Sequence, residues 1–179
     1  MAKKVYTIGL SKIEVGDMAS DGDMGATLAS LGYTYQDTCR MTQEDPETTD
    51  HYAEEVDDPV VSISRGGKTL FNFSIMNPDV SVMAKLLGGT GTPGTGTAAD
   101  TWEAPAKIPV VEKSVAITPE QGLKFEIPRL CMTTKINAEF SKSGILLLEV
   151  AGTVMTPLKS GIAKMKATTI SSTSTTGSS

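Results

Sequence analysis

The sequence predicts a mainly β fold with one short helix, and three observations support this prediction. The 179-residue chain holds 23 threonines, many of them in alternating patterns, and β-branched side chains fit a pleated strand better than a helix. Apolar and polar residues also alternate over long stretches, most regularly in residues 129–140. Only residues 77–88 carry the signals of a helix.

The size and composition of the chain predict a single domain. At 18.8 kDa, with 39% hydrophobic and 21% charged residues, the chain is large and apolar enough to build one core. We assign residues 1–167 to this domain and residues 168–179, ten of which are Ser or Thr, to a flexible tail. The sequence lacks an apolar run of membrane-spanning length and a signal peptide, so we expect a soluble intracellular protein with reduced thiols at Cys39 and Cys131.

The first predicted hairpin joins two alternating runs around a pair of glycines. Residues 69–76 alternate as a half-buried strand does, and residues 59–65 have the same character. Gly66 and Gly67, between the two runs, can supply the positive φ angles of a tight turn. We therefore expect these two runs to pair. The apolar side chains that share one face of the second run are Phe71, Phe73 and Ile75.

A helix of about three turns is predicted directly after this hairpin. Asn77 can cap free backbone N–H groups, Pro78 suits the first turn, and Asp79 favours the positive end of the helix dipole. Gly88 supplies the stop. The apolar side chains expected on one face are Val80, Met83 and Leu87.

The longest alternating pattern predicts a second hairpin, formed by residues 129–140 and 145–155 with a turn at residues 142–144. One face of its first strand is apolar and the other polar, so Ile136 is expected on the core face. The apolar face comprises Leu130, Met132, Thr134, Ile136, Ala138 and Phe140. Shorter strands are expected at residues 5–10, 12–18, 33–40, 110–117 and 123–127.

A Gly/Thr-rich segment, residues 88–97, is predicted to be a mobile loop. Its five Gly, four Thr and one Pro offer little apolar surface to offset the entropy of ordering. A phosphate-binding loop is disfavoured because no Gly-Lys-Ser/Thr follows and the segment leaves a helix instead of opening one.

Charge is distributed unevenly along the chain. Residues 1–106 hold seven Lys/Arg and sixteen Asp/Glu, a net charge of −9, whereas residues 107–179 hold nine and five, a net charge of +4. The overall charge of −5 and the pI near 4.9 argue against a sequence-specific nucleic-acid binder, which usually carries a basic face.

Most of the acidic excess lies in one run that contains no Lys or Arg, residues 44–58. Its carboxylates are Glu44, Asp45, Glu47, Asp50, Glu54, Glu55, Asp57 and Asp58. Their spacing is not that of a calcium loop, so we expect a solvated face or a contact with a partner, and we predict no metal or cofactor. A metal-dependent hydrolase that uses this run is the enzymatic alternative. A nucleophilic Cys39 with His51 and Asp50 is disfavoured because no nucleophile motif surrounds the cysteine.

The order of these signals resembles that of the major tail tube proteins of long-tailed bacteriophages. The acidic stretch leads into a strand hairpin, then into an Asn-Pro-Asp helix that ends at Gly88-Gly89, then into a Gly/Thr-rich loop and paired long strands. The resemblance covers residues 30–157 and is strongest over residues 59–90.

This resemblance implies a β-sandwich or partial barrel with one short flanking helix, which forms a hexameric ring with a continuous inner β-barrel. Stacked rings would form the tail tube of the virion, assembled in the host cytoplasm, which conducts genomic DNA without binding it specifically. The expected partners are further copies of the chain and the tape-measure, tail-tip and tail-terminator proteins, with no membrane. No catalytic residues are implied, so the protein is expected not to be an enzyme.

Two sets of residues are predicted to serve assembly. The eight carboxylates of residues 44–58 are candidates for ring stacking or subunit contacts. The polar side of the long hairpin is the candidate inner wall, with Arg129, Thr133, Lys135, Asn137 and Glu139. An acidic balance suits a DNA conduit because a basic lining would bind phosphates. The tube protein of a contractile secretion system is the closest alternative function.

Overall fold

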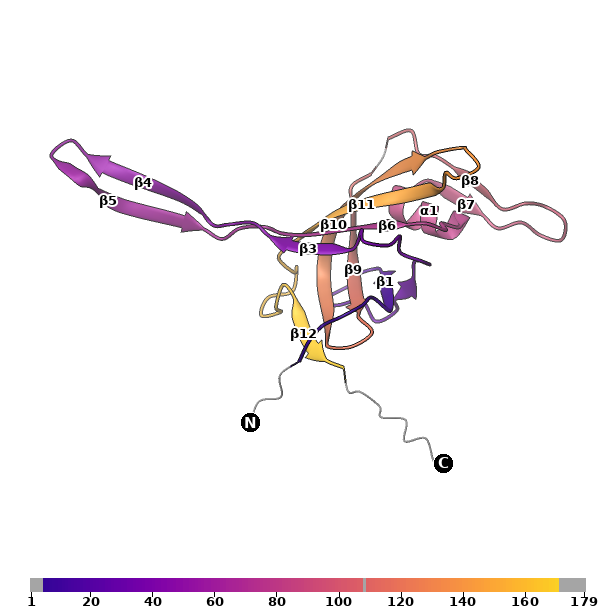
Figure 1. The fold of residues 1–179 in the computed structure, drawn as a ribbon, viewed down its shortest axis with the longest axis horizontal. Coiled ribbons are helices and arrows are strands. Elements are labelled where there is room, and N and C mark those ends of the chain that lie inside the picture. Colours follow the sequence, from indigo (N-terminus) through magenta and orange to yellow (C-terminus); the bar gives the residue numbers. More distant parts are fainter. Residues whose placement is uncertain (1–4, 108, 171–179) are drawn as a thin grey trace, which may run out of the picture.

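The computed structural model describes residues 5–107 and 109–170. Its centre is one antiparallel sheet of eight strands, accompanied by two separate two-stranded hairpins and one short helix (Figure 1). The prediction of a mainly β fold with one short helix is therefore confirmed. Over the described residues the sheet does not close into a barrel.

The elements are named here in chain order. The sheet contains β1 (Lys12–Gly16), β2 (Ala29–Ser30), β3 (Arg40–Gln43), β6 (Thr69–Ile75), β9 (Val111–Thr118), β10 (Leu123–Ala138), β11 (Leu146–Val154) and β12 (Lys166–Thr169). The separate hairpins are β4 (Glu47–Ala53) with β5 (Val56–Arg65), and β7 (Thr90–Thr92) with β8 (Thr101–Glu103). The helix is α1 (Val80–Leu87). The strand order is β2-β1-β9-β10-β11-β6-β3, with β12 also paired to β10.

The long strand β10 changes partners along its length. Its first half lies between β9 and β12, a register shift follows between Ile127 and Leu130, and its second half pairs with β11. Pro128 stands at this shift, where it cannot donate a ladder hydrogen bond. In Figure 1 the first half of β10, with β9 and β12, runs across the direction of β6 and β11. The sheet therefore has two lobes that share β9 and β10.

One hydrophobic core joins both lobes of the sheet to α1. The helix contributes Val82, Leu86 and Leu87, whereas Val80 and Met83, which we expected on the buried face, are only partly buried. The sheet contributes Ile13, Val15, Phe71, Phe73, Ile75, Val115, Ile117, Ile127, Leu130, Met132, Leu148 and Val150. The strands of both lobes thus turn their apolar side chains toward a common interior.

The helix begins two residues later than the sequence predicts, because Asp79 and not Asn77 is its cap, and it has only eight residues. The Asp79 carboxylate accepts a hydrogen bond from the backbone N–H of Val82 at 2.7 Å, and this bond lowers the pKa of Asp79. Asn77, the predicted cap, instead accepts from the backbone N–H of Tyr33 at 2.6 Å. The helix ends at Gly88, which has a φ of 73°.

The predicted pairing of residues 59–65 with residues 69–76 is wrong. β5 pairs with β4, while β6 lies between β11 and β3. Gly66 and Gly67 are not among the glycines with positive φ, so they form no tight turn. A Cβ atom at Gly67 would lie 1.8 Å from the carbonyl oxygen of Glu44, so this glycine permits the close approach of two chain segments.

The long hairpin is confirmed, with β10 and β11 paired from Leu130 and Val154 to Ala138 and Leu146. The apolar face of β10 is buried only as far as Thr134. Ile136 is 45% exposed, because β9 pairs with β10 only up to Met132 and the rest of the strand projects beyond it. Phe140, beyond the end of the strand, is 93% exposed. The expectation that these two side chains join the core is therefore wrong.

The shorter predicted strands have mixed outcomes. Residues 12–18, 110–117 and 123–127 correspond to β1, β9 and the start of β10. Residues 5–10 and 33–40 form only isolated bridges, at Ile8 with Gln121 and at Thr34 with Ile75, before β3 begins at Arg40. In both segments irregular backbone replaces the expected strand.

Two segments predicted to lack order contain strands. Within residues 88–97, β7 pairs with β8, and the indole N–H of Trp102 donates to the carbonyl of Gly88 at 2.9 Å. The predicted tail boundary at residue 168 falls inside β12, whose Thr168 and Thr169 pair with the start of β10. Residues 171–179 of that tail lie outside the described residues. No helix in the described part of the chain has the length and apolar character needed to cross a membrane.

Candidate functional site

A long protrusion, which we call the arm, is formed by β4, β5 and the turn between them, residues 47–65. It continues the pairing of β3 with β6: Gln43 lies opposite Thr69 in the sheet, and Glu47 lies opposite Arg65 in the arm. Between these pairs, the N–H of Glu44 donates to the carbonyl of Lys68 at 2.8 Å. One two-stranded ribbon thus leaves the body and projects far from it (Figure 1).

The arm has no core of its own. Every residue of β4 and β5 is exposed except Ala53, which is half-buried. The large apolar side chains exposed on it are Tyr52, Val56, Val60, Val61 and Ile63. An isolated two-stranded hairpin is at best marginally stable in water, and clustered exposed apolar side chains are typical of interaction surfaces. The subunit by itself leaves these side chains unburied.

The predicted acidic residues all lie on the arm or at its base. Six of the eight carboxylates belong to residues 47–65, Glu44 and Asp45 immediately precede them, and all eight are exposed. None of them forms an ion pair within the described residues. The structure therefore gathers them on one protrusion, and their role in subunit contacts is still a prediction.

A metal-binding arrangement is not found in the part of the chain that the structure describes. Over residues 5–107 and 109–170, no group of three His, Cys, Asp or Glu side chains is placed to hold a metal ion. His51 lies exposed on the arm, whereas Cys39 is half-buried in the body beside β3. These two residues therefore do not form the nucleophile and base that we considered.

The second candidate surface is one face of the four strands β3, β6, β11 and β10, which we call the polar face. The registers place Arg40, Asn72, Ala151 and Thr133 in one row across it. Thr133, Lys135 and Asn137, three of the predicted inner-wall residues, lie on this face and are exposed. All of these side chains alternate with core residues along their strands.

The other two predicted inner-wall residues lie at the margins of this face. Arg129 stands at the register shift of β10, where its Nη2 lies 2.8 Å from Oε1 of Glu112 on β9. Glu139 follows the last residue of β10 and therefore lies outside the strand. Arg129 keeps the alternation of Cys131 and Thr133, so it lies on the same side of β10 as the polar face, next to the register shift.

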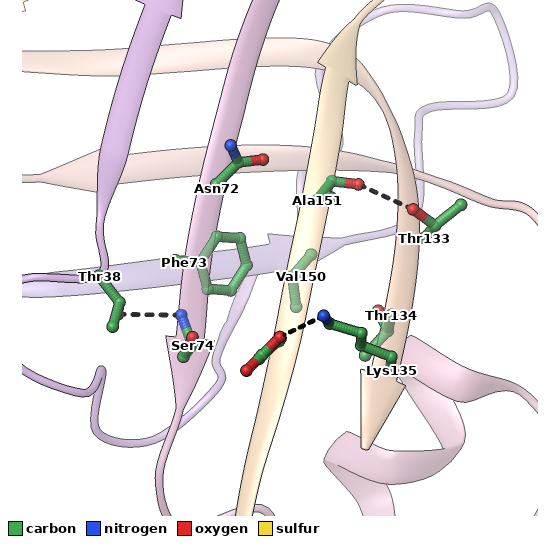
Figure 2. A pocket seen from close by; sticks show the side chains of 10 residues that line it. Thr38, Asn72, Phe73, Ser74, Thr133, Thr134, Lys135, Val150 and Ala151 are labelled. Carbon is green, nitrogen blue, oxygen red and sulfur yellow. Dashed lines mark hydrogen bonds and ion pairs between the residues drawn. The ribbon is translucent and has the colours of Figure 1, made fainter. Parts of the chain in front are cut away.

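Glu149 organises the middle of the polar face, and the sequence reasoning missed it. Its carboxylate lies 2.8 Å from the Lys135 ammonium and accepts a 2.7 Å hydrogen bond from Asn137. The Lys135 bond, and then the Asn137 bond, lower the pKa of Glu149. A shallow depression of about 350 Å³ lies beside this group, with Asn72, Ala151 and Thr133 across it (Figure 2).

The polar face is not acidic. Among its described strand residues the charged ones are Arg40, Arg129, Lys135 and Glu149; Lys135 is paired with Glu149, and Arg129 with Glu112 of β9. The face is not strongly basic either, and the suitability of the chain's acidic balance for a DNA conduit is still a prediction. The carboxylates lie on the arm instead.

The same four strands end in two unpaired edges. β3 pairs only with β6, and β10 beyond Met132 pairs only with β11. Among the described residues, no strand occupies the second side of either edge. Such edges expose free N–H and C=O groups and are templates for pairing with another chain.

No protein-family model matches the sequence, and no curated protein matches it. The arm, the polar face and the two edges are therefore the observations on which a function can be built. All three are surfaces suited to contact with other molecules.

Proposed function

We propose that this chain is a structural tube protein of a long-tailed bacteriophage, whose copies join edge to edge into rings that stack through their arms. The observation that supports this proposal best is a four-stranded sheet with one polar face and an unpaired edge on each side. In a hexameric ring, as in the family that the sequence resembles, the polar face would line the lumen.

The directions of the strands suit ring closure. The order β3-β6-β11-β10 is antiparallel throughout, so its two edge strands run in opposite directions. The β10 edge of a second copy can therefore add to the β3 edge of the first and continue the antiparallel pattern. Repetition of this contact about a rotation axis closes the sheet and removes both free edges.

The chemistry of the polar face suits passage of DNA without specific binding. Its row of Arg40, Asn72, Ala151 and Thr133 carries a single cation, Arg40, and the charge of Lys135 is neutralised by Glu149. DNA affinity rises with the number of phosphates that cations neutralise. A wall with few unpaired cations would hold the phosphates weakly, so the strand could slide.

The arm suits the contact between rings. It prolongs β3 and β6 along the strand direction beyond the body, and it carries exposed apolar side chains together with six carboxylates and one basic residue, Arg65. A receiving surface on the next ring would bury the apolar side chains and place cations near the carboxylates.

The state of assembly of the purified full-length chain tests this proposal. Light scattering across a wide concentration range and electron microscopy should show hexameric rings and, at high concentration, stacked tubes. A monodisperse monomer at every concentration, even when a tail tip is added as a nucleus, would contradict the proposal.

A further inference from the structure

We propose that Ile136 of one copy covers an apolar groove beside β3 of the next copy, so that ring closure buries a hydrophobic contact as well as pairing two strand edges. This inference rests on the proposed ring. It assigns a partner to a side chain that the isolated subunit leaves half-exposed.

The groove lies on the core side of β3 and has a volume of about 930 Å³. Cys39, Met41 and Gln43 line it from the edge of the sheet. Leu10, Phe125 and Met165 line it from the other lobe and the neighbouring segments. All but Gln43 of these six are partly buried apolar side chains, which is typical of a surface that a partner completes.

Ile136 lies at the opposite edge of the same four strands and on the same side of the sheet. It pairs with Leu148, which pairs with Ile75, and both of these are fully buried core residues. Ile136 therefore points to the core face, yet it is 45% exposed because no strand flanks it there among the described residues.

The two features come together when the edges pair. Met41 lies opposite the buried Phe71, so it too points to the core face. Side chains on one face of a sheet stay on that face when another strand is added, and directly opposite Cβ atoms lie about 4.5–5.5 Å apart. Addition of β10 of the next copy to β3 thus places Ile136 on the side where Met41 and the groove lie.

The segments of the chain outside the described residues offer little to fill the groove. Residues 1–4 and 171–179 contain Met1 and Ala2 as their only apolar side chains, and the rest are Lys, Ser, Thr and Gly. Burial of such polar residues against Met41 and Phe125 would be unfavourable. A second copy, which carries Ile136 on a complementary edge, is the better occupant.

A disulfide cross-link tests this contact directly. We would introduce Met41→Cys and Ile136→Cys into one full-length chain that also carries Cys39→Ala and Cys131→Ala. Within one copy the two positions lie on the outer strands of the four-stranded sheet and in different rows, so three strand spacings alone separate them by at least about 14 Å. A disulfide needs Cα atoms within about 7 Å. Any bond must therefore join two copies.

Mild oxidation of assembled protein should give a ladder of covalent oligomers that ends at the closed ring. Each single-cysteine variant should give no ladder. The matched pair Met41→Cys with Thr133→Cys should also give none, because Thr133 lies on the polar face. A second variant, Ile136→Asp, should stay folded but weaken ring formation at least tenfold, whereas Leu158→Asp, at an exposed position outside the sheet, should assemble normally.

The outcomes separate this contact from the proposed ring. Rings seen by microscopy that give no ladder, or that form from Ile136→Asp as readily as from the wild type, would overturn the contact and leave the ring intact. A wild-type chain that never forms rings would overturn both proposals.

Discussion

The arm and the sheet that it leaves are one continuous ribbon, yet they are held together by different means. In β6 the side chains of Phe71, Phe73 and Ile75 are fully buried, whereas every side chain of β5 is exposed. The backbone pairing is antiparallel in both parts. The difference shows that strand formation and core formation are separable in this chain: the body is stable through burial, whereas the arm pairs two strands without burying their side chains.

The largest expected difference between the two regions comes from one charge placed in each. Leu148→Asp puts an unpaired carboxylate at a fully buried site of the sheet, and should destabilise the subunit by more than about 4 kcal/mol. Val61→Asp places the same group on the exposed arm and should change the free energy of unfolding by about 0.5 kcal/mol or less. Chemical denaturation measures both. Equal losses would mean that the arm is packed against the body.

Removal of the arm tests whether it serves assembly alone. Replacement of residues 46–66 by Asn-Gly, a dipeptide favoured in tight hairpin turns, would join β3 to β6 directly, because Glu44 and Lys68 are already hydrogen-bonded. The shortened chain should keep the thermal unfolding midpoint of the wild type and form rings, but no tubes. Tubes of normal length in electron micrographs would refute a stacking role for the arm.

Neutralisation of the arm's tip should have a smaller effect, on the rate of assembly. The four changes are Glu54→Gln, Glu55→Gln, Asp57→Asn and Asp58→Asn. Each exposed ion pair contributes only about 0.2–1 kcal/mol, and salt screens it beyond roughly 8–10 Å, but the contact repeats around the ring. We expect a folded subunit whose tubes elongate more slowly, and high salt should slow the wild type in the same way.

A matched control neutralises four exposed carboxylates of the body that form no ion pair among the described residues. These changes are Asp37→Asn, Asp100→Asn, Glu103→Gln and Glu120→Gln. This variant should elongate at the wild-type rate, as followed by turbidity. If the arm variant also does so at low ionic strength, its carboxylates form only a solvated surface.

The smallest expected effect on stability comes from a change at the cap of α1. This helix packs against the core of the sheet, and the arm has no such element. Asp79→Ala removes the hydrogen bond to the Val82 N–H and should cost about 1 kcal/mol at neutral pH. The pKa of Asp79 is lowered in the folded state, so its contribution is present at neutral pH and is lost as the pH falls below about 4. The stability difference from the wild type should shrink over that range.

Asp79→Asn provides the matched control for this cap. An amide oxygen can accept the same hydrogen bond but does not titrate, so the variant should lose less stability and the loss should not follow the carboxyl titration. A difference between Asp79→Ala and the wild type that stays constant from neutral pH to pH 3 would show that the carboxylate charge contributes nothing.

The parts of the fold that the sequence predicts well are those where burial imposes a pattern. β6 and the hairpin of β10 with β11 alternate because one face packs on the core, and α1 is bounded by Asp79 and Gly88. The partner of β5 could not be predicted in this way, since alternation indicates a strand but does not identify its neighbour, and β5 is exposed on both faces. We assigned Gly67 to a tight turn, but it permits the close approach of Glu44. The sequence alone does not distinguish these two uses of a glycine.

The candidate surfaces could be predicted only in part, because alternation identifies the residues of one strand but not the strands that lie beside it. Thr133, Lys135 and Asn137 follow from alternation along one strand, but Glu149, Asn72 and Arg40 come from strands whose order depends on pairings distant in sequence. Ile136 was assigned to the core because its position in the pattern is that of a core residue. The structure shows that β9 stops pairing with β10 at Met132. The alternating pattern of β10 therefore continues beyond the part of the strand that packs on the core.

The direct passage of β5 into β6 has a mechanical consequence. β6 lies inside the sheet, with six residue pairs to β11 on one side and four to β3 on the other. A pull on the arm would act along β6, perpendicular to these interstrand hydrogen bonds, so the bonds would be loaded together in shear instead of opening one after another. If the proposed tube were bent or stretched, tension between rings would therefore pass into β6, a strand inside the sheet of each subunit, and the arm would act as a mechanical link.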